Sequence, residues 1–191
     1  MSTMAILSVL IAIYGFSFLF LPEGAGSDEI RERFWSAPWA GFGHTFGGGL
    51  ALLLGPIQFS RRIRRRWISV HRWAGRAYAL AVIAGGVSGL YLSTVTFGGA
   101  VATAGFGMLA ILWLISIGFA WIRIRQGDKR AHRIWMIRNF SLTLAAVSLR
   151  FILPALTAGF ELPFEQAYMS VAWLCWVPNL IVAEWVILRR P

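Results

Sequence analysis

Apolar residues recur in six long runs along the chain, and short polar or cationic segments separate these runs. A helix needs about 20 predominantly apolar residues to cross the hydrocarbon core of a bilayer, and each run approaches or exceeds that length. The pattern therefore predicts an all-α protein with a single six-span transmembrane domain over residues 1–191. The expected spans cover about residues 4–21, 41–59, 72–93, 101–122, 133–157 and 168–188.

The stretch from Arg130 to Pro154 has the most informative pattern, because its polar and small residues recur at helical spacing. At about 100° per residue they share one face of a helix. Unsatisfied polar groups are costly in hydrocarbon, so this face should turn toward other helices or a wet cavity. The positions on it are His132, Met136, Asn139, Thr143, Ala146 and Arg150.

Small residues stand in line with a histidine at two other expected spans, with His44 in 41–59 and with His71 directly before 72–93. Such faces permit close approach by a neighbouring helix. The expected span 101–122 has few polar residues, and we expect it to pack mostly against lipid.

Composition places the chain in the membrane class, since 58% of its 191 residues are hydrophobic and only 14% are charged. The net charge of +10 does not indicate nucleic acid as a partner, because the cations lie beside apolar runs, where they set topology. Of the 18 Lys and Arg residues, all but Arg31, Arg33 and Arg150 fall on the side that holds both termini of a six-span chain. The positive-inside rule then predicts that both termini are cytoplasmic.

The single cysteine, Cys175, excludes an internal disulfide and any multi-cysteine metal or iron–sulfur site. Six spans use nearly the whole chain, which leaves no room for a soluble catalytic domain. Any chemistry must take place within or at the edges of the helix bundle. Whether the protein is an enzyme is left open by the sequence.

Four blocks of sequence resemble a known family: LLLGPIQF with His44 upstream, HRWAGRAY, HRIWMIRNFSLTLAAVSLR, and AWLCWVPNL with Glu184 beyond it. They are similar, in the same order, to the bacterial membrane family catalogued as domain of unknown function 2306. The resemblance covers the second to sixth expected spans. It implies a multi-pass protein of the bacterial cytoplasmic (inner) membrane and brings no established activity.

His71 and His132 lie at the starts of the third and fifth expected spans, so two helices that enter from the same side present a histidine at the same depth. Transmembrane b-type cytochromes hold haem between histidines on different helices. The pattern predicts one haem b with these two histidines as metal ligands, and electron transfer with quinone or another membrane redox subunit. The cations that would neutralise the haem propionates are Arg72, Arg76, Arg133 and Arg138.

Two other functions fit the same residues. His-Arg pairs at an interface also anchor helices or attract a lipid phosphate, which indicates a non-enzymatic lipid- or anion-binding module or an accessory subunit of a membrane complex. The third possibility is a small-molecule transporter, for which Arg150, His44 and an interrupted sixth span are the indications.

Several polar residues fall inside expected spans, where ionisable groups are costly and often functional. We expect Glu184 to form a packing salt bridge with Arg138 or Arg76. Pro178 should interrupt the sixth span and free backbone carbonyls. The intramembrane polar residues are His44, Asn139, Arg150, Asn179 and Glu184. The candidate partners of Arg150 are Glu161, Glu165, Asn179 and His44.

Overall fold

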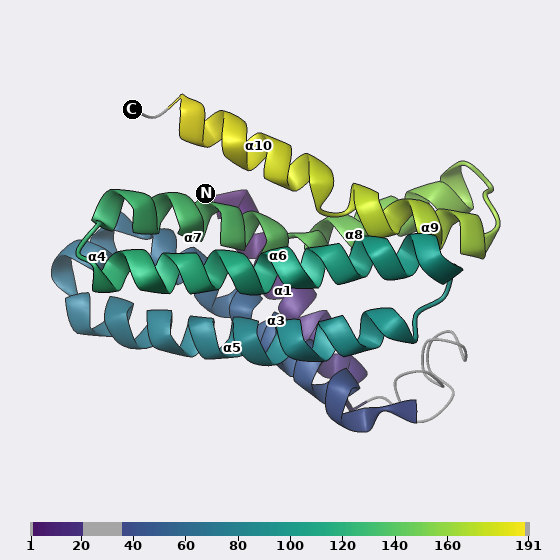
Figure 1. Cartoon of the computed structure of the whole chain (residues 1–191), viewed down its shortest axis with the longest axis horizontal. Helices are drawn as coiled ribbons and strands as arrows, with labels where there is room; N and C mark the ends of the chain where they lie inside the picture. Colours follow the sequence, from purple (N-terminus) through teal and green to yellow (C-terminus); the bar gives the residue numbers. More distant parts are fainter. Residues whose placement is uncertain (1, 21–35, 190–191) are drawn as a thin grey trace. The chain divides into compact units, whose positions relative to one another are not determined.

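The computed structural model describes residues 2–20 and 36–189, and these residues form helices joined by turns, with no strand among them. The predicted all-α class is confirmed. Arg31 and Arg33, which the topology argument used, lie outside the described residues, as does the end of the first expected span. The helices form two compact units, residues 1–92 and residues 93–191 (Figure 1). The expectation of a single domain remains a prediction.

The first unit is built around a glycine-rich helix. Its helices are α1 (Ser2–Phe18), α3 (Pro38–Phe59), α4 (Arg61–Arg66) and α5 (Ile68–Thr94), of which the last residues of α5 belong to the second unit. Pro38 stands at the first position of α3, where a missing N–H costs nothing. The Ser60 hydroxyl accepts a hydrogen bond from the Ile63 N–H at 3.3 Å and so begins α4.

The backbones of α3 and α5 approach so closely that a side chain has no room between them. A Cβ added at Gly47 of α3 would lie 2.6 Å from both the Ala81 carbonyl oxygen and the Gly85 nitrogen of α5. α1 packs against the same helix α3. The first unit therefore depends on glycine where its helices cross.

The second unit is organised around α6. Its elements are α6 (Gly99–Arg125), α7 (Lys129–Thr143), α8 (Ala145–Pro154), the π-helical turn η1 (Ala155–Gly159), α9 (Phe164–Leu174) and α10 (Val177–Leu188). α6 packs against α7 and α9, α10 packs against α7, and α8 packs against α9. The turn from α6 to α7 needs glycine at Gly127, whose φ is 81°, and Asp128 Oδ1 then caps α7 by accepting from the Ala131 N–H at 2.9 Å.

The expected span 101–122 lies in α6, which packs against both α7 and α9, and the expectation that it packs mostly against lipid remains a prediction. Trp113 and Ser116 are both buried. The sequence of this helix shows little polarity, because an indole N–H and a serine hydroxyl change the hydropathy of an apolar run only slightly. They are nevertheless enough to bind polar groups on a neighbour.

By length and composition, four stretches of the described residues could cross a membrane: Ile68–Thr94, Gly99–Arg125, Lys129–Gly159 and Phe164–Leu188. They contain the third to sixth expected spans. The other two expected spans also form helices, but α1 has only 17 residues and α3 owes a lower hydropathy to its glycines and His44. The structure supports several apolar helices and does not support the count of six.

Two of the four stretches are interrupted near their midpoints. The first is broken at Leu144, between α7 and α8, and the second at Cys175 and Trp176, between α9 and α10. Pro178 lies just inside α10, where proline is favoured, so the interruption precedes it. The sequence predicted the second interruption and gave no signal for the first.

Candidate functional site

The polar face of α7 is bound along its length to α6. His132 Nδ1 lies 2.8 Å from the Ala120 carbonyl oxygen. About two turns further along, Asn139 Nδ2 donates to the Trp113 carbonyl oxygen at 2.9 Å and to Ser116 Oγ at 2.8 Å. Asn139 is fully buried. The predicted polar face thus meets a neighbouring helix.

The contact continues at Thr143, the last residue of α7. Its hydroxyl accepts a hydrogen bond from the Trp113 indole N–H at 2.9 Å and donates to the Asn139 carbonyl oxygen at 3.1 Å. Trp113 and Ser116 are the partners that the sequence interpretation missed. Their spacing of three residues on one helix face was the available signal.

Asn179 joins the two interrupted stretches. Its amide Nδ2 donates to the Cys175 carbonyl oxygen at 3.0 Å and to the Ser141 carbonyl oxygen at 3.3 Å. Its Oδ1 accepts from the Ser148 hydroxyl at 3.1 Å. Cys175 lies in one break and Ser141 lies about one turn before the other, so this amide supplies donors to carbonyls near an interrupted helix.

Arg138 and Glu184 form the predicted salt bridge. Arg138 Nε lies 2.6 Å from Glu184 Oε1 and Nη2 lies 2.9 Å from Oε2, a bidentate geometry between α7 and α10. The side chains keep 27% and 41% of their surface exposed. The Arg138 guanidinium also lies 4.6 Å from the ring centroid of Trp135, which stacks on Phe119. The pair is neutral as a whole and ties α10 to α7.

Arg150 turns back on its own helix. Its Nη1 donates to the Ala146 carbonyl oxygen at 2.8 Å, one turn earlier in α8, and its side chain is half-buried. This contact was not among the partners expected from the sequence.

The three histidines lie in different places. His44, on α3, has Nδ1 2.9 Å from the Gly85 carbonyl oxygen of α5. His71, at the start of α5, is half-buried and belongs to the first unit with Arg72 and Arg76. His132 belongs to the second unit with Arg133 and Arg138. Neither unit holds both predicted haem ligands, and residues 2–20 and 36–189 contain no cluster of three or more His, Cys, Asp or Glu able to hold a metal ion.

A family comparison covers most of the chain. The family described as "Predicted membrane protein (DUF2306)" matches residues 41–187. The chain belongs to this family. The resemblance seen in the four sequence blocks is therefore confirmed, and the DUF2306 chain is a membrane protein with several apolar helices. A search of curated proteins and a search of solved structures each gave no match.

The DUF2306 chain also carries a strongly cationic surface in its first unit, which we call the arginine–tryptophan surface. The arginines of α4 are all exposed, and Trp67 and Trp73 beside them are 63% and 68% exposed. The Arg76 guanidinium lies 4.7 Å from the Trp73 ring. The residues of this surface are Arg61, Arg62, Arg64, Arg65, Arg66, Trp67, Arg72, Trp73 and Arg76.

Among the described residues of the first unit, the arginine–tryptophan surface has no acidic counterpart. Residues 2–20 and 36–92 contain no Asp or Glu. In the second unit, by contrast, Arg138 is neutralised by Glu184. The described part of the first unit therefore combines positive charge, without an acid of its own, with aromatic rings suited to a membrane interface.

Proposed function

We propose that this DUF2306 protein is a non-enzymatic membrane module that binds the phosphate groups of anionic lipids at its cytoplasmic face. The observation that carries the proposal is the arginine–tryptophan surface, which is exposed and lacks acidic residues in the described first unit. Each cation near an anionic membrane surface contributes about 1 kcal/mol to binding. Arginine is also suited to phosphate because its guanidinium presents two parallel N–H donors.

The position of α4 supports this proposal. It is a six-residue connection between two long apolar helices. In the proposed six-span topology, its exposed arginines lie at the level where α3 leaves the hydrocarbon and α5 enters it. Tryptophan prefers that level, and Trp67 and Trp73 flank the arginines on the α5 side. Headgroup phosphates are the anions available there.

The proposal includes a topology of six spans with both termini in the cytoplasm of a bacterial inner membrane. Tight packing of α1 and α3 against each other supports their insertion as a pair, despite the short α1 and the glycines of α3. Single cysteines at Ser36, Gln126 and Glu165 in a Cys175→Ala background would test it. An impermeant maleimide should label the cysteines at Ser36 and Glu165 from the periplasmic side, and the one at Gln126 only after the membrane is opened.

Lipid binding is tested by native mass spectrometry of the protein in detergent with equal concentrations of phosphatidylglycerol and phosphatidylcholine. The double variant Arg62→Gln/Arg65→Gln should reduce binding of phosphatidylglycerol about thirtyfold, since the two lost charges together remove about 2 kcal/mol. Arg62→Lys/Arg65→Lys is the matched control and should retain most of the binding, because it keeps the charge. Equal binding by the glutamine variant and the wild type would overturn the proposal.

A haem b protein is the second candidate, and one specific observation favours it. Because the Ala120 carbonyl can only accept, His132 Nδ1 carries the proton and Nε2 keeps the lone pair that a metal needs. The sequence pattern assigns His71 as the second ligand and Arg72, Arg76 and Arg133 as the cations that neutralise the propionates. Arg138, the fourth cation of that pattern, is already paired with Glu184. Haem would supply one-electron chemistry with a quinone or a membrane redox subunit.

The haem candidate is tested by the visible spectrum of protein purified from haem-sufficient cells. A Soret band that His71→Ala and His132→Ala both abolish, and that His44→Ala retains, would support it. A colourless, folded protein would end it.

A further inference from the structure

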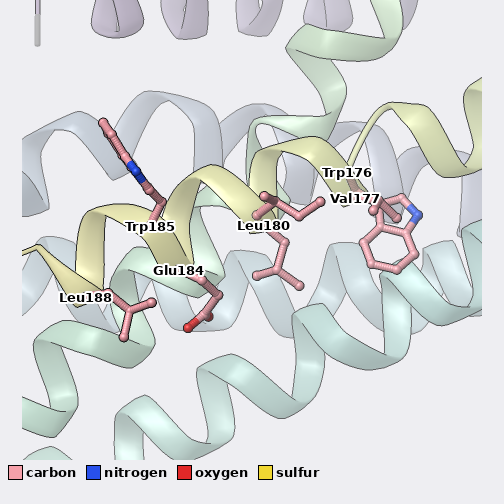
Figure 2. A pocket seen from close by; sticks show the side chains of 7 residues that line it. Trp176, Val177, Leu180, Glu184, Trp185 and Leu188 are labelled. Carbon is pink, nitrogen blue, oxygen red and sulfur yellow. The ribbon is translucent and has the colours of Figure 1, made fainter.

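An apolar groove runs along one side of α10 in the second unit. It has a volume of about 450 Å³ and is lined by Trp176, Val177, Leu180, Ile181, Glu184, Trp185 and Leu188. Figure 2 shows that these side chains follow one another along the helix, from its start to its last turn. Six of the seven lining residues are apolar, so the groove suits a hydrocarbon chain.

The one acidic residue in the groove is already neutralised. Both carboxylate oxygens of Glu184 are within hydrogen-bond distance of the Arg138 guanidinium, at 2.6 and 2.9 Å. An apolar ligand would cover this pair without leaving a single charge in hydrocarbon. A polar solute would gain little from the rest of the lining.

The length of the groove matches one membrane leaflet. From Trp176 to Leu188 the helix rises about 18 Å, at 1.5 Å per residue. Half of the hydrocarbon core is about 15 Å thick. One acyl chain of a phospholipid would therefore follow the groove from the headgroup level to the middle of the bilayer.

The end of the groove carries a cation at the place where a headgroup would lie. The Arg189 guanidinium lies 4.0 Å from the Trp185 ring centroid, directly after the last lining residue. Tryptophan is enriched at the membrane–water interface. An arginine stacked on its ring can bind a phosphate through two parallel N–H donors. The charge and the dimensions of the groove together select one ligand class.

We infer that the groove of α10 holds one anionic phospholipid, with an acyl chain along Leu180 and Glu184 and with its phosphate on Arg189. This inference rests on the proposed binding of anionic lipids and places a specific site in the second unit, away in sequence from the arginine–tryptophan surface. The site selects lipid by its chain and its headgroup, whereas the surface recognises charge alone.

The experiment uses the full chain, with phosphatidylglycerol and phosphatidylcholine of identical chains as probes in native mass spectrometry. The wild type should retain one phosphatidylglycerol under collisional activation that removes phosphatidylcholine. Leu180→Trp fills the groove and should reduce this retained adduct at least about fivefold, which corresponds to about 1 kcal/mol. Val182→Trp lies on α10 outside the groove and is exposed, so it should leave the adduct unchanged.

Arg189→Gln provides a second variant that leaves every side chain of the groove lining unchanged. It should keep a bound lipid but lose the preference for phosphatidylglycerol over phosphatidylcholine. Equal retention by the Leu180→Trp and Val182→Trp variants would overturn the inference, as would a preference that survives Arg189→Gln or a quinone found in place of the lipid. Arg62→Gln/Arg65→Gln tests the proposed function separately, because it should leave the single retained lipid in place.

Discussion

The two units of this protein hold their helices together in different ways. In the first unit α3 and α5 meet backbone to backbone at Gly47 and Gly85, and a single Cβ would not fit. In the second unit α7 is joined to α6 by Asn139 and Thr143, and to α10 by the bidentate pair of Arg138 and Glu184. Glycine also serves in the second unit, but only one crossing, α6 with α9 at Gly105, is comparably close among its described residues.

The difference follows from the absence of a hydrophobic driving force between helices in lipid. Association then depends on close van der Waals packing or on hydrogen bonds. Glycines allow two helices to pack closely over a long surface but do not determine their register, whereas polar pairs determine which residue of one helix lies opposite which residue of the other. The first unit is thus specified mainly by shape and the second mainly by directional bonds. Four sets of variants test this contrast, from the largest expected effect to the smallest.

Gly47→Ala should have the largest effect, because the new methyl group would lie 2.6 Å from backbone atoms that cannot rotate away. We expect a loss of about 3 kcal/mol in the free energy of unfolding, at the upper end of overpacking costs. The loss is measured by titration with sodium dodecyl sulfate, followed by circular dichroism.

Gly48→Ala is the matched control on the same helix, since nothing lies within 4 Å of its added Cβ. It should be neutral or stabilise by up to about 1 kcal/mol, the helix propensity difference between alanine and glycine. If both alanine variants were equally stable, packing by shape would not describe the first unit.

Glu184→Gln should rank second, because it leaves the Arg138 charge without its partner. We expect a loss of about 2 kcal/mol, less than the 3–5 kcal/mol of a fully buried pair, because the Glu184 side chain is 41% exposed. The double variant Arg138→Gln/Glu184→Gln should recover most of the loss in a double-mutant cycle. A double variant that adds the two single losses would show that the pair is not coupled.

Asn139→Leu should cost about 1 kcal/mol, since it removes two hydrogen bonds between helices that are worth roughly 0.6 kcal/mol each in a membrane. Cys175 is fully buried in the same unit and is the chain's single cysteine, so the rate of its reaction with a maleimide reports the opening of this unit. The rate should rise in Asn139→Leu and stay unchanged in Ser141→Ala, whose hydroxyl bonds within its own helix. Equal rates in both variants would contradict the role of Asn139.

His44→Phe and His132→Phe should have the smallest effects, about 0.6 kcal/mol each. Each removes one contact between Nδ1 and a carbonyl oxygen of a neighbouring helix, Gly85 in one unit and Ala120 in the other. Both units thus use a histidine contact to a backbone carbonyl of a neighbouring helix. Similar losses of stability in thermal unfolding would show that the two units differ only in their close glycine contacts and their polar side-chain pairs. A much larger loss for His132→Phe would indicate a second role for that ring.

The sequence predicted the all-α class and the polar face of α7 because both follow from periodicity. It also predicted that Glu184 pairs with Arg138 or Arg76, since an acid in an apolar run needs a cation within reach, and the structure has Arg138 as the partner. It missed the partners on α6, because Trp113 and Ser116 have little weight in a hydropathy pattern. The break at Leu144 was missed for a similar reason, because the apolar run around it contains neither proline nor glycine.

The joint that Asn179 makes between two interrupted stretches has a mechanical consequence. The Asn179 amide is hydrogen-bonded to Ser141, Ser148 and Cys175, which lie before and after Leu144 and at the break that precedes α10. One side chain therefore fixes the lengthwise register of the two stretches at their interruptions, so neither stretch can slide along the other unless these bonds break.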